Sequence, residues 1–251
     1  MQQIPKIIHY CWFGGNPKPQ LVLDCIESWR KYCPDYEIRE WNEDNFDVNS
    51  VQYVKEAYEA KKWAFVSDYV RLHALSMYGG IYLDTDMELL KPIEKFMSDD
   101  AFVGYETKDS PATGIIGCVS GHPLIEKLSE YYKKHPFSRD GEIVTSSGPV
   151  IISGIFEQEG TKLDGKLKTS CGCKIYPEKT FYPNGMAELF NRHPKESFAY
   201  HHYMGSWGAQ GSIYRRNFLQ RLKMLAVKIG RNTIGTRRMY LLSCRLKGVK
   251  P

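Results

Sequence analysis

The chain has 251 residues, of which 42% are hydrophobic and 13% aromatic, and its formal net charge is +5. This length allows one substantial hydrophobic core, and the apolar content excludes a disordered chain. No apolar run reaches the ~18 residues that would span a membrane, and seven cysteines without a disulfide or zinc spacing predict reduced thiols.

Strand-like and helix-like segments alternate through the first 135 residues. Apolar spacing predicts strands at 6–12, 36–41, 79–86 and 101–105, and helices at 21–32, 51–61, 63–78 and 122–134. This alternation predicts an α/β fold with a Rossmann-like open sheet of the nucleotide-binding kind. Ligands of such sheets bind at the carboxyl ends of the strands. Residues 136–200 are rich in Gly, Pro and Ser, and we expect them to form loops around a site.

Charge divides the chain into two parts. Residues 212–251 contain eleven Lys and Arg and no Asp or Glu, whereas residues 1–211 contain 23 basic and 29 acidic side chains. We therefore expect a globular domain at 1–211 and a basic, amphipathic helical segment at 212–251. Apolar residues at helical spacing favour an anionic membrane surface over nucleic acid as the partner of this segment. A self-packed or solvated C-terminal helix is the alternative.

Two aspartates follow an apolar run at residues 79–86, with the sequence GGIYLDTD. In an extended segment Tyr82, Asp84 and Asp86 would point to the same side, where two carboxylates repel each other and are costly to bury. A divalent cation removes this cost, and hard oxygen ligands suit Mg²⁺ or Mn²⁺. A strand that ends in a polar turn is the structural alternative.

The predicted helix at 63–78 carries a polar stripe just before the Gly-Gly pair. Asp68 and Arg71 are three residues apart and share one face, and Ser67 directly precedes them on the same helix. Alone, they would read as an ordinary surface ion pair. Because the helix leads directly into the Asp-x-Asp segment, its stripe is expected to border the same cleft.

Four motifs together carry a family resemblance: IIHYCWFGG at 7–15, AFVSDYVR at 64–71, GGIYLDTD at 79–86 and HHYMGSW at 201–207. In this order they resemble glycosyltransferase family 32, which contains a yeast initiating mannosyltransferase and many bacterial capsule enzymes. The first three are also similar to the glucosyltransferase domain of the large clostridial toxins. The resemblance implies a GT-A fold, a metal-dependent nucleotide-sugar donor and retention of anomeric configuration.

The resemblance also implies roles for individual residues. Trp12 would stack on the nucleobase, Asp68 and Arg71 would bind the donor sugar and the diphosphate, and Asp86 would bind the metal directly. The full expected donor site is Trp12, Phe13, Ser67, Asp68, Arg71, Tyr82, Asp84, Ser206 and Trp207, with Asp68, Arg71 and Asp86 as catalytic residues and Asp84, Asp86 and His201 at the metal. Which of His201 and His202 points inward stays open at this stage.

The expected reaction is transfer of a hexose of the galactose or glucose type, with a UDP-sugar favoured over a GDP-sugar. The acceptor would be a glycan or a lipid-linked oligosaccharide of capsule or exopolysaccharide synthesis. The enzyme would then be cytoplasmic, peripheral on the inner face of the membrane. Asp68, Glu106 and Asp109 are the only obvious candidates for a carboxylate nucleophile, so front-face substitution is the working mechanism.

Three points stay open in the sequence. Segment 106–121 has no unmistakable counterpart in the family, and it should define the choice of donor sugar. A non-catalytic nucleotide-sugar-binding module on the same fold is the first alternative, and a nucleic-acid-binding protein with a basic tail is the second. Turnover, and the complete metal and phosphate set, would distinguish the enzyme from both.

Overall fold

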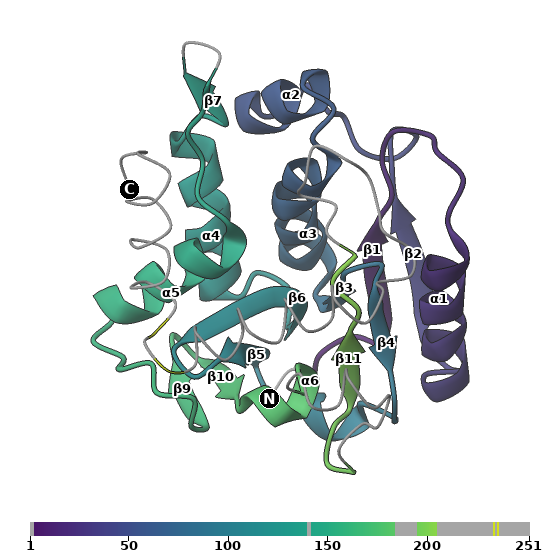
Figure 1. The fold of residues 1–251 in the computed structure, drawn as a ribbon, viewed down its shortest axis with the longest axis vertical. Helices are drawn as coiled ribbons and strands as arrows, with labels where there is room; N and C mark the ends of the chain where they lie inside the picture. Colours follow the sequence, from purple (N-terminus) through teal and green to yellow (C-terminus); the bar gives the residue numbers. More distant parts are fainter. Residues whose placement is uncertain (1–2, 140–141, 184–194, 205–232, 234, 236–251) are drawn as a thin grey trace.

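The computed structural model describes residues 3–139, 142–183, 195–204, 233 and 235. Within these residues, seven strands form one sheet in the order β2-β1-β3-β6-β5-β10-β9, and two small two-stranded sheets, β11-β4 and β7-β8, lie beside it (Figure 1). The strands are β1 (Ile7–Cys11), β2 (Glu37–Trp41), β3 (Gly80–Leu83), β4 (Met87–Leu89), β5 (Ala101–Thr107), β6 (Ser110–Cys118), β7 (Ser138–Arg139), β8 (Glu142–Ile143), β9 (Lys168–Ser170), β10 (Cys173–Tyr176) and β11 (Ala199–His201).

Helices pack on both faces of the large sheet. One hydrophobic cluster joins it to α2, α3, α4 and α5, and a second joins the opposite face to α1, the 3-10 helix η1 and α6. These helices are α1 (Gln20–Tyr32), α2 (Gln52–Glu59), α3 (Trp63–Tyr78), η1 (Glu94–Phe96), α4 (Pro123–Lys134), α5 (Gly148–Gln158) and α6 (Glu178–Phe181). Two covered faces make this a layered α/β fold, as the alternating pattern predicted.

The direction of the strands gives the sheet its open α/β character. Strands β2, β1 and β3 are mutually parallel, and β5 and β10 run the same way, whereas β6 and β9 are reversed. The predicted open sheet is therefore confirmed, with antiparallel strands inserted at its centre and at one edge.

The central strand β6 is the main element that the sequence did not reveal. All nine of its residues, Ser110–Cys118, are buried. Its sequence mixes Pro, Thr and Gly, so it shows neither a continuous apolar run nor alternation. Gly117 is required by packing, because a Cβ there would lie 2.1 Å from the Phe102 ring. The segment without a family counterpart is therefore largely core.

Other predicted elements lie within a few residues of the observed ones, with two corrections. Residues 136–200 were expected to be loops but contain β7 to β10, α5, α6 and part of β11. The expected strand at 79–86 ends at Leu83, and Asp84–Asp86 form a turn before β4. The alternation argument for the two aspartates was therefore wrong, because a turn and not a pleated strand sets their directions. The division at residue 211 lies outside the described residues, as does nearly all of 212–251.

The six cysteines among the described residues are all unpaired, and five of them are buried. No helix among the described residues has the length and apolar content needed to cross a bilayer.

The motif histidine His9 is a buried clamp in the core. Its Nδ1 accepts a hydrogen bond from Trp41 Nε1 (3.1 Å), so its Nε2 donates to the carbonyl of Gly79 (2.9 Å). This joins β1, β2 and the glycine turn before β3. Burial lowers the pKa of His9 to about 4, so the ring is neutral in the folded protein.

We expect the free energy of unfolding to depend on pH because of the buried, neutral ring of His9. Since the unfolded histidine has a pKa near ~6.5, the unfolded chain binds more protons as pH falls from ~6.5 to ~4, and up to about 3 kcal/mol of stability is lost. Urea unfolding of His9→Gln between pH 5 and 7.5 should give a lower free energy of unfolding than the wild type at pH 7.5. The free energy of unfolding of the variant should also change less with pH. His135→Gln, an exposed control, should leave both unchanged. An unaltered slope in His9→Gln would contradict this role.

Candidate metal and donor site

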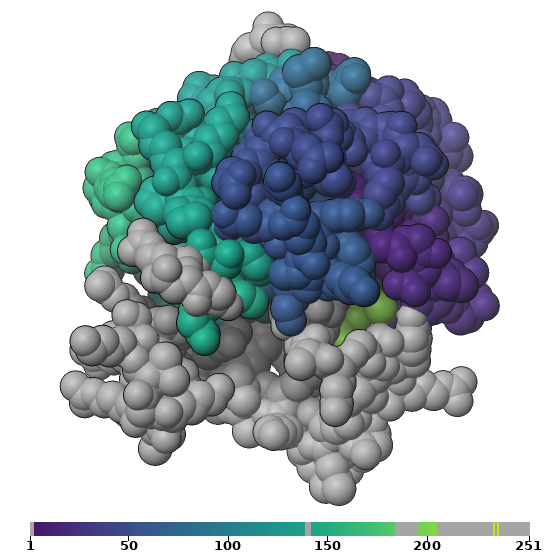
Figure 2. Space-filling model, turned by 90° about the horizontal axis from the view of Figure 1, so that it is seen from above, coloured from purple at the N-terminus to yellow at the C-terminus, as the bar shows by residue number. Residues whose placement is uncertain are grey.

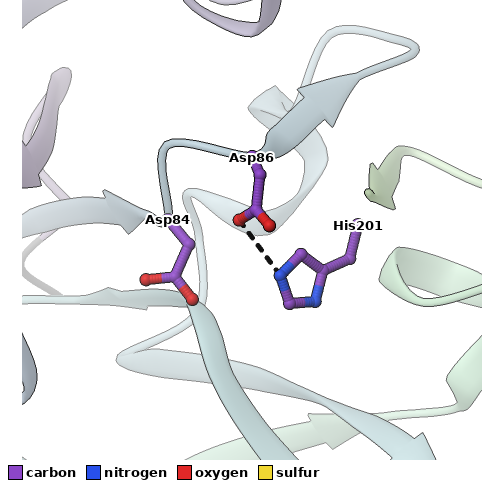
Figure 3. A group of neighbouring side chains, drawn as sticks. All are labelled: Asp84, Asp86 and His201. Atoms are coloured by element: carbon purple, nitrogen blue, oxygen red, sulfur yellow. Dashed lines mark hydrogen bonds and ion pairs between the residues drawn. The ribbon is translucent and has the colours of Figure 1, made fainter. Parts of the chain in front are cut away.

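Three metal-ligand side chains converge at the carboxyl end of β3. One ligand atom from each of Asp84, Asp86 and His201 lies within 4.8 Å of the others. Figure 3 shows the two carboxylates on the turn between β3 and β4, with the imidazole of β11 directed at Asp86. Antiparallel pairing of β11 with β4 places His201 opposite Met87, which brings a residue 115 positions away beside Asp86.

Asp86 and His201 hold each other in the charged form. Burial opposes ionisation of Asp86, but the imidazole of His201 at 3.1 Å and the backbone N–H of Met204 at 2.7 Å outweigh it and lower the carboxyl pKa to about 2. Burial likewise opposes protonation of His201, and the Asp86 carboxylate outweighs it and raises the imidazole pKa. His201 Nδ1 is buried without a hydrogen-bond partner among the described residues.

The open choice between the two histidines is settled by their partners. His202 Nε2 lies 2.9 Å from Glu88 Oε2, while its backbone N–H donates to the carbonyl of Asp86. Its ring therefore faces Glu88 and only His201 joins the cluster of Asp84 and Asp86.

Arg71 reaches the same cluster from α3 and is almost fully buried. Its Nη2 lies 3.3 Å from Asp84 Oδ1 and 2.9 Å from Asp68 Oδ1, and its Nη1 donates to the carbonyl of Thr113 at 2.6 Å. The guanidinium also lies over the Tyr82 ring, 4.5 Å from its centroid. Arg71 therefore holds Asp84 in place, and a contact with a diphosphate remains a prediction.

Asp68 is a buried carboxylate with little compensation. It is 2% exposed, and neither oxygen accepts a hydrogen bond from a described residue, although Arg71 lies close enough for an ion pair. Burial raises its pKa to about 7, and Arg71 only partly offsets that effect. An acceptor-rich side chain held without donors is suited to receive hydroxyl groups of a ligand.

The other predicted donor-site residues have different surroundings. Trp12 is half-buried, and its Nε1 donates to the carbonyl of Asn16. Phe13 is 4% exposed and packs edge-on against Phe46, and so it is a core residue. Ser67 Oγ donates to the carbonyl of Trp63 one helical turn before it.

Tyr82 is buried, and its hydroxyl donates to Asp84 Oδ1 at 3.1 Å. Its role is therefore to orient an aspartate of the cluster. Ser206 and Trp207 lie outside the described residues.

Tyr182 borders the site and had no signal in the sequence. It follows α6, its hydroxyl accepts from the backbone N–H of Ile115, and its ring lies 5.9 Å from that of His201. Gly114 lets β6 approach this corner, because a Cβ there would lie 3.0 Å from Asp84 Oδ2. No local pattern could reveal either contact, since both depend on long-range packing.

The donor set fits a divalent cation. The two carboxylates offer hard oxygen ligands and the imidazole offers a nitrogen ligand. Mn²⁺ binds both kinds of ligand, whereas Mg²⁺ would be held mainly by the carboxylate oxygens. Arg71 and the protonated form of His201 balance the negative charge around Asp84 and Asp86. A metal ion at the cluster would replace the proton of His201.

Fold and site together define the class: an α/β protein whose sheet ends in an Asp-x-Asp turn with a metal-ligand cluster, as in DXD glycosyltransferases. Residues 19–103 match the family described as glycosyltransferase sugar-binding region containing DXD motif. The resemblance predicted from the sequence is confirmed by this match.

The chain is also similar to curated proteins and to a solved structure. An inositol phosphoceramide mannosyltransferase 3 of Schizosaccharomyces pombe is 26% identical over 61% of this chain and 45% of its own length. Mannosyl phosphorylinositol ceramide synthase CSH1 of Saccharomyces cerevisiae is 28% identical over 62% of this chain and 43% of its own. The chain thus spans less than half the length of these relatives. A solved glycosyltransferase involved in glycosylation of the major capsid of PBCV-1 is 13% identical, with a TM-score of 0.49 over 88% of this chain and 100% of that one.

Proposed function

We propose that this protein transfers a hexose from a nucleotide sugar to a hydroxyl acceptor in a metal-dependent, retaining reaction on a GT-A type fold. The observation that carries the proposal is the convergence of Asp84 and Asp86 with His201, which lies 115 residues after Asp86. The buried Arg71 beside them supports it. A structural ion-pair cluster would not need an imidazole nitrogen, His201 Nδ1, that is buried without a partner among the described residues.

Each residue of the cluster has a distinct part in this proposal. Asp84, Asp86 and His201 would hold Mn²⁺ or Mg²⁺, which when bound neutralises the charge that develops on the departing diphosphate. Arg71 and Tyr82 orient Asp84, and Asp68 accepts hydroxyl groups of the donor sugar.

Front-face substitution accounts best for retention. The bond from the anomeric carbon to the diphosphate breaks while the acceptor oxygen bonds to the same face, and the acceptor proton passes to the departing phosphate. A covalent route needs a carboxylate nucleophile beside the sugar. Of the three candidates, Asp68 is ion-paired with Arg71, and Asp109 accepts a hydrogen bond from Thr107 Oγ1 on the β5–β6 turn. Glu106, whose charge acts on His201, is the alternative nucleophile.

A lipid-borne acceptor is the acceptor class that we favour. The names of the two curated relatives refer to inositol phosphoceramide and to mannosyl phosphorylinositol ceramide, and the basic segment 212–251 suits an anionic membrane surface. A lipid-linked oligosaccharide of capsule synthesis at the inner face of the membrane is the particular form expected from the family. Two described residues of the segment touch the β5–β6 turn: Lys108 Nζ donates to the carbonyl of Thr233, and Gly235 lies against Asp109.

The metal requirement gives the most direct test of this function. Incubation of the full chain with UDP- and GDP-sugars should release nucleoside diphosphate slowly in the presence of Mn²⁺. EDTA should stop the release, and added Mn²⁺ should restore it. Full activity after exhaustive chelation would contradict the metal assignment. Metal-dependent binding without turnover, even with lipid and glycan acceptors, would instead favour the non-catalytic binding module.

A further inference from the structure

Strand β6 carries a bulge at the corner of the metal cluster. Val103 of β5 pairs with Ile116, but the next residue of β5, Gly104, pairs with Ala112, so residues 113–115 have no partner on β5. Bulges of this kind are over-represented beside active sites, where they redirect backbone groups and side chains. The backbone groups of these three residues are therefore available to other elements.

Two carbonyl groups of the bulge hold Asp84 in place. The carbonyl of Gly114 accepts from the backbone N–H of Asp84 at 2.8 Å. The carbonyl of Thr113 accepts from Arg71 Nη1 at 2.6 Å, and Arg71 Nη2 lies 3.3 Å from Asp84 Oδ1. The Tyr82 hydroxyl donates to the same Oδ1 at 3.1 Å. The protein thus fixes Oδ1 and leaves Oδ2, on a side chain that is 26% exposed, as the oxygen directed at a metal ion.

Tyr182 supports the bulge from the opposite side. Its hydroxyl accepts from the backbone N–H of Ile115 at 2.9 Å, so the third residue of the bulge is also held. Burial, together with the charges of Asp84 and Glu106, raises the pKa of Tyr182. The hydroxyl therefore stays neutral and serves as a hydrogen-bond partner. Loss of its oxygen would leave the Ile115 N–H without an acceptor inside the sheet.

Glycines in both central strands make room for Tyr182. A Cβ on Gly104 would lie 3.1 Å from Cε2 of the Tyr182 ring. A Cβ on Gly114 would lie 3.2 Å from the Tyr182 hydroxyl and 3.0 Å from Asp84 Oδ2. Any larger residue at either position would displace the tyrosine, and at Gly114 it would displace the aspartate as well.

Tyr182 lies beneath the cluster and not at its surface. Segment 195–204, which carries His201, reaches the surface as a small yellow-green patch beside the purple N-terminal part of the chain (Figure 2). Tyr182 is 1% exposed, and its ring lies 5.9 Å from that of His201. It can therefore act on a bound ion only through its neighbours.

We propose that Tyr182 is a positioning residue of the metal site: through the bulge of β6 it keeps the Asp84 carboxylate directed at the metal ion. The inference rests on the metal assignment of the proposed function. Residues that orient metal ligands typically change metal affinity by about 10- to 100-fold when they are substituted.

The test measures Mn²⁺ binding by the full chain without nucleotide, from the electron paramagnetic resonance signal of the free ion. Tyr182→Phe removes only the hydroxyl group, and we expect it to weaken Mn²⁺ binding about 10-fold or more. Gly114→Ala should have an effect in the same direction, because its Cβ would press on Asp84 Oδ2. In both variants, a higher Mn²⁺ concentration should restore part of the nucleotide-sugar hydrolysis.

Tyr105→Phe is the matched control for a general loss of stability. Tyr105 is as buried as Tyr182, but it packs in the hydrophobic cluster on the opposite face of the sheet. Urea unfolding in EDTA gives the free energy of unfolding of each variant. Tyr105→Phe should leave the Mn²⁺ affinity unchanged, even if its free energy of unfolding falls as much as that of Tyr182→Phe.

The outcomes separate this inference from the proposed function. Unchanged Mn²⁺ affinity in Tyr182→Phe would overturn the positioning role and leave the proposed function standing. An equal loss of affinity in Tyr105→Phe would overturn it too, because the loss would then follow from destabilisation alone. If Tyr182→Phe does not fold, Gly114→Ala decides, and normal Mn²⁺ affinity there would overturn the inference. A wild-type chain that binds no Mn²⁺ would overturn the metal assignment together with this inference.

Discussion

Asp86→Asn is expected to reduce metal-dependent sugar transfer by a factor of about 10² to 10³, as removal of a group that stabilises developing charge does elsewhere. The same change should cost the metal-free protein about 2 kcal/mol of stability at pH 7.5. The carboxylate of Asp86 has its pKa lowered to about 2 in the fold. Its stabilising effect is therefore present above pH ~4, the pKa of an unfolded aspartate, and is lost as pH falls through the folded pKa.

Nucleotide-sugar hydrolysis with Mn²⁺, together with urea unfolding in EDTA, measures both effects of Asp86→Asn. Glu88→Gln is the matched control, because Glu88 lies two residues further along the chain and faces His202. It should keep activity within a few-fold of the wild type. If Asp86→Asn retains Mn²⁺-stimulated turnover, Asp86 is not a metal ligand.

Asp68→Asn is expected to have opposite effects on activity and stability. Burial raises the pKa of Asp68 to about 7, so the folded protein binds a proton that the unfolded chain releases near pH ~4. The stability contributed by protonated Asp68 is present below pH ~4 and is lost as the pH rises to ~7. Asparagine stays neutral and imitates the protonated side chain. At pH 8 the variant should be about 2–4 kcal/mol more stable than the wild type, while transfer should fall by about 10²-fold.

Urea unfolding at pH 5 and pH 8 measures the stability change of Asp68→Asn, and steady-state transfer measures the activity. Asp44→Asn, an exposed control, should alter neither. A variant that is less stable than the wild type at pH 8 would show that the ion pair with Arg71 outweighs the cost of burial. In that case Asp68 would be a structural partner of Arg71. It would not lower the stability of the unliganded protein, as a residue kept for ligand binding is expected to do.

Local patterns in the sequence were sufficient for much of the fold. The apolar spacing at 21–32 predicted α1, because Val22, Cys25 and Ile26 lie with Trp29 on the helix face that contacts the core. The order of the four motifs predicted a DXD glycosyltransferase, which the family model supports. Strand β6 was not predicted, because its Thr, Pro and Gly residues give no apolar periodicity. Only its burial on both faces within the sheet identifies it.

The sequence alone determined the residue types of the site: two aspartates in a Gly-Gly-led segment, an Asp-Arg pair one helix earlier and a histidine near the end of the domain. Only the tertiary structure decided how they meet. Pairing of β11 with β4 turns His201 toward Asp86 and His202 toward Glu88. Packing of α3 against the sheet buries Asp68 and raises its pKa. The physical reason is that side-chain direction at a strand end and the loss of water around a charge depend on neighbours that lie far away in the sequence, which no local spacing encodes.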